Sequence, residues 1–162
     1  ASDVYKRQKD GVQQVILNGE NVTSLLRTEE TGKMASKTSK YAAVRTKLVA
    51  LQRGLAKKTD VIMDGRDIGT TVLPDAFAKI YLTASSDARA KRRYDELKEK
   101  GENCSFDAIK EDIEKRDYED MHRAISPLKQ ADDAVLVDTS DMNIEQVVAA
   151  LSKIIDEKKA GR

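Results

Sequence analysis

The amino-acid sequence predicts an α/β protein whose core is a parallel β-sheet flanked by helices. Three short apolar runs, at residues 61–63, 79–83 and 134–137, have the composition of buried strands. A segment with helical spacing of apolar residues precedes or follows each run, and this alternation is typical of parallel sheets. Only these three core strands are visible, and a doubly wound sheet normally has more, so the predicted sheet is short of strands.

Length, composition and charge narrow the class of protein. The 162 residues, of which 40% are hydrophobic and 35% charged, are enough for one domain with a buried core. The net charge of +1 argues against bulk nucleic-acid binding. No apolar run is long enough for a membrane span, and no secretory signal is expected. The single Cys104 excludes a disulfide framework, and with only His122 besides it, a metal site would depend on carboxylates.

The first part of the chain predicts a hairpin followed by a helix. Residues 1–10 have no helical or strand period and are expected to be a disordered lead-in. Residues 12–22 contain a β-prone run and the dipeptide Asn18-Gly19, a strong hairpin signal. Further along, apolar residues at spacings of 3 and 4 predict a helix with one apolar stripe: Tyr41, Val44, Leu48, Leu51 and Leu55.

Capping residues mark the helices of the second part. Three residues are candidates to cap the helix after the second core strand: Ser85, Ser86 and Asp87. Gly101 is expected to end this helix. Ser105 is expected to cap the next helix, and Asn143 with Gln146 resembles a capping box before the last one. The last predicted helix has an apolar face: Ile144, Val147, Val148, Leu151, Ile154 and Ile155.

The segment at residues 61–70, VIMDGRDIGT, is the first candidate site. Ligands of open parallel sheets bind beyond the carboxyl ends of the strands, where Asp64, Arg66 and Asp67 are expected. The glycines of this segment let the backbone turn tightly and approach a ligand. A plain turn, in which the acids and the arginine pair with one another, stays equally open.

Arg116, Asp120 and Arg123 form a second candidate site. Their spacings of 4 and 3 place them on one face of a predicted helix. Two arginines beside one carboxylate can bind a phosphate bidentately and hold a sugar hydroxyl. The alternative is a solvated, salt-bridged helix face. The apolar start of the same stripe, at Ile109 and Ile113, favours a position in a cleft.

A basic cluster begins the helix after the second core strand: Arg89, Lys91, Arg92 and Arg93. Positive charge in the first turns opposes the helix dipole, so the cluster suggests an anionic partner, and a plain surface cluster is the open alternative. The TGK at residues 31–33 is not a phosphate loop, because Met follows the lysine and no glycine lies five residues before Gly32.

Several segments, taken in order, resemble bacterial cytidylate kinases, which are nucleoside monophosphate kinases. The resemblance runs from about Val12 to the last predicted helix. Its segments are VILNGENVTSLLRT, MASKTSKYAAVR, VIMDGRDIGTTVLPDA, KIYLTASSDARAKRR, IKEDIEKRDYEDMHRAISPL and AVLVDTS. Each alone is weak, whereas their order and spacing are specific.

The resemblance implies a P-loop-kinase-like parallel-sheet core flanked by helices, with a monophosphate-binding lobe and a helical lid. It implies a CMP-binding lobe at residues 10–56, an α/β core at residues 57–162 and a lid around residues 88–120. Residues 1–9 do not match the family's pattern. The implied reaction transfers the γ-phosphoryl group of ATP to CMP or dCMP with Mg²⁺. A cytoplasmic monomer is expected, with nucleotides as partners and neither nucleic acid nor a membrane.

Carried over motif by motif, the resemblance also implies residue roles. Three residues are implied as contacts of the cytosine base: Ser36, Arg45 and Asp67. Two arginines are implied to hold the acceptor phosphate: Arg66 and Arg123. Two residues are implied to hold the sugar: Arg116 and Asp120. Asp64 is implied to orient arginines or the water shell of the metal. Three lid arginines are implied as contacts of the ATP phosphates: Arg89, Arg92 and Arg93. Arg93 is also implied as a catalytic residue, together with Arg66 and Arg123.

One departure from the family's pattern concerns activity. The family begins with a strand, a glycine-rich phosphate loop with its lysine and a helix, and this unit is absent from the 162 residues. We therefore expect weak CMP binding at most and no kinase activity. Two interpretations stay open: a CMP kinase whose sequence is truncated here, and a non-catalytic pyrimidine-nucleotide-binding module that lost its phosphate loop naturally. Others are a kinase for UMP or AMP and an RNA-associated α/β protein, which the balanced charge disfavours.

Overall fold

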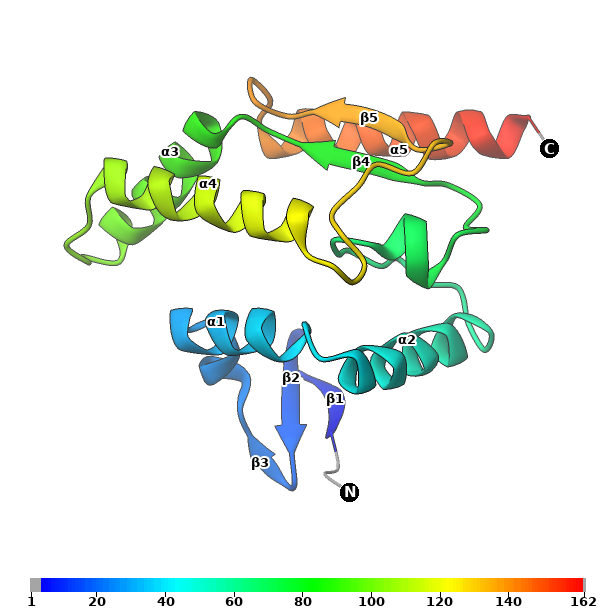
Figure 1. Cartoon of the computed structure of the whole chain (residues 1–162), viewed down its shortest axis with the longest axis horizontal. Helices are drawn as coiled ribbons and strands as arrows, with labels where there is room; N and C mark the ends of the chain where they lie inside the picture. Colours follow the sequence, from blue (N-terminus) through cyan, green and yellow to red (C-terminus); the bar gives the residue numbers. More distant parts are fainter. Residues whose placement is uncertain (1–3, 162) are drawn as a thin grey trace. The chain divides into compact units, whose positions relative to one another are not determined.

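The computed structural model describes residues 4–161 of the chain (Figure 1). The chain folds into two compact units, Ala1–Leu48 and Val49–Arg162. The division falls inside the helix α2 (Ala42–Ala56), whereas the sequence predicts a boundary after residue 56. Within the described residues, no helix combines the length and the apolar character that crossing a membrane requires.

An antiparallel sheet forms the start of the first unit. Its strands, which are neighbours in chain order, are β1 (Val4–Lys9), β2 (Val12–Leu17) and β3 (Glu20–Asn21). All six residues of β1 have partners in β2. The prediction of a disordered lead-in is therefore wrong for residues 4–9, and residues 1–3 lie outside the described part of the chain.

Two dipeptides with positive φ close the hairpins of this sheet. Asn18 and Gly19, with φ of 51° and 87°, join β2 to β3 and confirm the predicted hairpin. Asp10 and Gly11, with φ of 53° and 75°, join β1 to β2 in the same way. Positive φ at both central residues is the conformation whose twist matches that of paired strands. Asp10-Gly11 is the sequence signal from which the hairpin of β1 and β2 could have been predicted. The polar run VYKRQK before it lacks the apolar period that is typical of a strand.

Two helical segments follow the sheet. The short 3₁₀ helix η1 (Thr23–Arg27) leads into α1 (Glu29–Thr38). Thr28 caps α1, since its hydroxyl accepts a hydrogen bond from the backbone nitrogen of Thr31 at 3.2 Å. Ser36, which the resemblance implies as a contact of the base, therefore lies on a regular helix.

The helix α2 confirms the predicted helix, but its apolar stripe is not buried. The exposed fractions of the stripe lie between 40% and 59%: Tyr41, Val44, Leu48, Leu51 and Leu55. A surface helix normally turns its apolar face to a core. In α2, spacing therefore predicts the helix correctly without predicting burial.

Two of the three predicted core strands form in the second unit. The strands β4 (Ile80–Thr83) and β5 (Val135–Asp138) pair in parallel along their whole length. The third prediction is wrong: residues 61–63 are not a strand, and the side chain of Ile62 is 100% exposed. An apolar run becomes a strand only when a neighbour accepts and donates its backbone hydrogen bonds, and no described strand pairs with this one.

Three helices complete the second unit (Figure 1). They are α3 (Ser86–Glu99), α4 (Phe106–His122) and α5 (Ile144–Ala160). Of the three candidate caps of α3, Ser85 is the one whose side chain accepts from the helix backbone. The predicted cap Ser105 of α4 and the capping box of Asn143 and Gln146 before α5 are confirmed.

The helices α3 and α4 pack against each other, as Figure 1 shows. The rings of Tyr94 and Phe106 meet edge to face, with centroids 6.2 Å apart. The buried apolar residues described in the second unit are few: Val72, Ala84, Ala90, Leu97 and Val137. Leu82 in β4 and Leu136 in β5 are 53% and 56% exposed, so this sheet is not covered on both faces as a parallel sheet usually is.

Candidate functional site

The loop after residues 61–63 turns tightly at Asp67. One turn of π-helix, η2 (Ile68–Val72), begins directly after it. The carbonyl oxygen of Asp67 accepts from the backbone nitrogens of Thr71 and Val72, at 2.8 and 3.2 Å. Val72 is only 1% exposed and anchors the turn in the core, and Asp67 itself is 5% exposed. The sequence-predicted acid therefore lies at the buried start of an ordered turn.

Arg66, one residue earlier, makes the central ion pair of the candidate site. Its Nε lies 2.8 Å from Oδ2 of Asp120, near the end of α4. Nη1 of Arg123 lies 3.9 Å from Oδ1 of the same carboxylate. The side chains of Asp120 and Arg123 are 10% and 12% exposed, whereas that of Arg66 is 46% exposed. The structure thus brings two of the predicted phosphate-binding arginines to one buried carboxylate.

The predicted common helix face is only partly right. Arg116 and Asp120 lie one turn apart in α4, but Arg123 follows the last residue of the helix with extended backbone dihedrals. The chain bends back after Arg123, since the backbone nitrogen of Leu128 donates to the carbonyl of Asp120 at 2.8 Å. Nε of Arg123 donates to the carbonyl of Ser126 in this bend. Arg116 is exposed, and among the residues that the structure describes its side chain has no hydrogen bond or ion pair.

A cavity of about 550 Å³ lies beside this cluster, entirely within the second unit. Its charged lining residues are contributed by the 64–67 loop, α3, α4 and the segments around β4 and β5: Asp64, Arg66, Asp67, Lys79, Arg89, Arg92, Asp117 and Lys129. A volume of this order suits a small-molecule ligand such as a nucleotide. Asp64 is exposed at its rim, where the sequence places it at the end of the first apolar run.

The basic cluster on α3 is engaged with other protein groups. Nη1 and Nη2 of Arg89 donate to the two carboxylate oxygens of Asp117, at 3.0 and 2.5 Å, and this hydrogen bonding raises the pKa of Arg89. Arg92 donates to the backbone carbonyls of Thr139 and Met142. Arg93 donates to Glu96 at 2.8 Å. The side chains therefore link α3 to α4, to the loop after β5 and to its own next turn.

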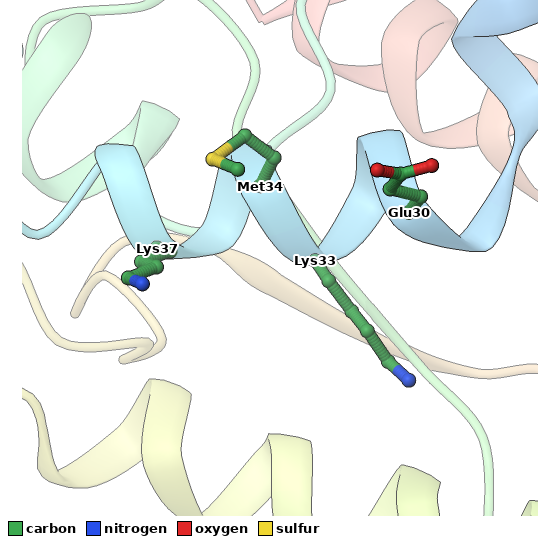
Figure 2. Close-up of a pocket in the computed structure, with 4 residues that line it drawn as sticks. All are labelled: Glu30, Lys33, Met34 and Lys37. Carbon is green, nitrogen blue, oxygen red and sulfur yellow. The ribbon is translucent and has the colours of Figure 1, made fainter.

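Ser36 and Arg45 belong to the other unit. Ser36 is half-buried in α1, where its carbonyl accepts from the hydroxyl of Ser39 at 2.9 Å, and Arg45 is half-buried near the start of α2. A shallow hollow of about 470 Å³ lies along α1, and Figure 2 shows its lining side chains: Glu30, Lys33, Met34 and Lys37. All four come from one helix and Ser36 is not among them, so the hollow is separate from the predicted base contacts.

The sequence does not predict two residues that contact the site or the turn beside it, Asp117 and Arg53. Asp117 lies between Arg116 and Asp120 in the sequence, but its partner Arg89 is 28 residues away, so no local spacing signals the pair. Arg53 in α2 donates from Nε to the carbonyl of Val72 at 2.9 Å and from Nη2 to that of Thr71 at 2.6 Å. These separations of 18 and 19 residues also leave no local pattern.

Metal-ligating side chains do not gather in the described part of the chain: no group of three or more His, Cys, Asp or Glu residues is placed to hold an ion. A magnesium ion bound by substrate phosphates needs only one or two carboxylates and keeps most of its water. Asp64, exposed at the cavity rim, is a carboxylate that fits a contact of this kind.

The family model and the similar proteins that match this chain all have the same description. A family model described as cytidylate kinase matches residues 3–157, which include most of the residues that the sequence analysis leaves unmatched. The cytidylate kinase of Lactobacillus johnsonii is 52% identical over 158 residues, 98% of this chain and 69% of that protein. That of Lactobacillus gasseri is 51% identical over the same shares. That of Leuconostoc mesenteroides is 51% identical over 90% of this chain and 65% of its own length.

Proposed function

The chain belongs to the cytidylate kinase family, and from that premise we propose that its reaction transfers the γ-phosphoryl group of ATP to CMP or dCMP. The products are ADP and CDP or dCDP. The observation that carries the proposal is the convergence of Arg66 and Arg123 on the buried Asp120 beside a nucleotide-sized cavity. Such catalysis needs positioning and charge neutralisation and no covalent protein intermediate.

Arg66 and Arg123 hold the phosphate of CMP in this proposal. A guanidinium group offers a rigid fork of donors that matches two phosphate oxygens. Nη2 of Arg123 is buried and, among the described residues, has no hydrogen-bond partner, so it offers a donor that a phosphate oxygen would satisfy. Asp120 keeps both arginines in place and accepts from a sugar hydroxyl. Arg116, one turn before it, donates to the sugar oxygens.

Asp67 reads the cytosine base in this proposal. Its carboxylate accepts from the exocyclic amine of cytosine, the pairing that carboxylates make with this base. Uracil presents a carbonyl at the same position, which would leave two acceptors facing each other in a buried site. Ser36 and Arg45 are proposed as further base contacts, on the strength of the family's motifs alone.

ATP with its Mg²⁺ is the proposed phosphoryl donor, and Arg89, Arg92 and Arg93 are the proposed contacts of its phosphates. Each of these arginines already donates to a protein group, so ATP would have to replace those hydrogen bonds. The 162 residues contain no glycine-rich loop followed by Lys and Ser or Thr. We therefore expect that this chain, assayed as it is, binds CMP only weakly and transfers no phosphoryl group.

Titration calorimetry of the full chain with CMP, dCMP, UMP and AMP tests the proposal. We expect CMP and dCMP to bind more tightly than UMP and AMP, and R66Q to weaken CMP by roughly tenfold or more, since a charge-assisted hydrogen bond is lost. The exposed K57Q, in the same unit, is the matched control and should bind CMP like the wild type. Equal affinity for all four nucleotides, or none, would overturn the base assignment.

A coupled assay of ADP release then tests the expected inactivity. A chain that binds CMP selectively and releases no ADP meets this expectation. Turnover at ordinary enzyme concentration would instead contradict the expected inactivity and leave the kinase assignment standing. RNA binding that weakens steeply with salt would favour the remaining alternative.

A further inference from the structure

We propose that Arg53 is a positioning residue for base recognition, because it fixes the turn that begins at Asp67. The inference rests on the proposed role of Asp67 as the reader of cytosine. Arg53 lies in the last turn of α2, outside the segment that contains Asp67, and does not line the cavity. It therefore acts on the base only through the backbone of the turn.

The hydrogen bonds of Arg53 end on the last carbonyls of η2. Nε donates to the carbonyl of Val72 at 2.9 Å, and Nη2 donates to that of Thr71 at 2.6 Å. The final carbonyls of a helical turn have no partner inside the turn and carry partial negative charge. A guanidinium fork satisfies two of them at once and supplies the opposite charge.

The same two residues hold the other end of the turn. The backbone nitrogens of Thr71 and Val72 donate to the carbonyl of Asp67 at 2.8 and 3.2 Å. Arg53 and Asp67 thus contact the same two residues, one through their carbonyls and the other through their N–H groups. Hydrogen bonds arranged in such a chain polarise and strengthen one another. Loss of the Arg53 donors would loosen the peptide that orients the Asp67 side chain.

Other contacts hold the middle of the turn and do not replace Arg53. Lys79 packs so close to the turn that a Cβ at Gly69 would lie 3.2 Å from its Cδ. Its ammonium group binds Asp133 at 2.6 Å and the carbonyl of Pro74. Within the described residues it makes no hydrogen bond to Thr71 or Val72. The 1% exposure of Val72 keeps the turn in the core when Arg53 is removed. We therefore expect the Arg53 variants to fold, with a local change at the turn.

The test compares R53Q, R53K and the control K57Q in the full chain. Two readouts are measured: the ratio of the dissociation constants for UMP and CMP, and the amide hydrogen exchange of Thr71, Val72 and Leu73 without nucleotide. We expect R53Q to lower the ratio by roughly 2- to 30-fold, the range of such indirect couplings, and to speed the exchange. R53K should change both readouts less than R53Q does, because lysine keeps the positive charge but lacks the fork. K57Q should change neither.

Each outcome decides a separate point. If R53Q weakens CMP and UMP equally, with their ratio unchanged, Arg53 has a structural role only and the proposal is wrong. Unchanged amide exchange in R53Q shows that the turn does not depend on Arg53 and also overturns it. If the wild-type chain has no preference for CMP, both the proposed function and the role of Arg53 in base selection are wrong. The exchange rates then test only whether Arg53 holds the turn.

Discussion

Nε of Arg66 lies 2.8 Å from Oδ2 of Asp120, and 54 residues of sequence separate the two. Asp120 is almost fully buried at the end of α4, while Arg66 extends from the loop before η2 with about half of its side chain exposed. Arg66 also lines the cavity. The pair therefore holds a cationic group where an anionic ligand can reach it.

Replacing this carboxylate should affect stability and binding together. In D120N the charge that Arg66 and the buried Arg123 share is lost, and a buried donor without its partner costs about 1–3 kcal/mol. We expect the free energy of unfolding in urea to fall by that order and CMP affinity to drop. D112N, an exposed acid of the same helix, is the control for both measurements. A D120N chain as stable as the control would show that Asp120 does not organise the arginines.

A change at Asp67 should alter base selection more than affinity for the phosphate. The amide of D67N can donate to the carbonyl of uracil, so the preference for CMP over UMP should fall by roughly 5- to 150-fold, the range of one good polar contact to a base. Competitive titrations with both nucleotides measure the preference, and the exposed Asp75, changed to Asn, is the control. An unchanged preference would place the base contact elsewhere.

The pair between Arg89 and Asp117 should stabilise the contact of α3 with α4 modestly. Its geometry is bidentate, but about a third of the Arg89 side chain is exposed and solvent screens the charges. We expect D117N to lower the free energy of unfolding by up to about 1 kcal/mol, and by less at high salt. E111Q on the exposed side of α4 serves as the reference. A loss that is equal at low and high salt would contradict an electrostatic origin.

The elements that sequence predicts well here are those with local causes. Ser85, Ser105 and Asn143 cap the helices as expected, because a cap needs only the first turn of its own helix. The strand predicted at residues 61–63 fails for the opposite reason: pairing is a property of two segments, and β4 pairs with β5 instead. The helix α2 shows the same limit, since spacing predicts its stripe but not what covers it.

The candidate site follows the same division. Asp64, Arg66 and Asp67 could be singled out because they follow an apolar run, and Asp67 does begin an ordered turn. Residues whose partners lie far away in the sequence could not be predicted in this way. Asp117 has its partner 28 residues away, and Arg53 binds backbone carbonyls, which no pattern of side chains indicates. Residue types alone do not predict contacts to main-chain atoms.

The pairing of Glu96 makes a prediction about pH. Hydrogen bonds from Lys100 and then from Arg93 lower the pKa of Glu96 from its ordinary value of 4.5 to about 2. Because the pKa is lower in the folded chain, the pairing stabilises the fold fully above pH 4.5, and this contribution is lost as the pH falls toward 2. The wild type should therefore be more stable than E96Q near pH 6, and the difference should shrink between about pH 5 and pH 2.

Urea denaturation of both chains across this pH range measures the difference. E99Q, an acid of the same helix without an ion pair among the described residues, controls for the loss of one negative charge near the end of α3. Because about half of the Glu96 side chain is exposed, we expect a small effect that salt reduces. A difference between wild type and E96Q that stays constant down to pH 2, or grows, would mean that the carboxylate is not held ionised by Lys100 and Arg93.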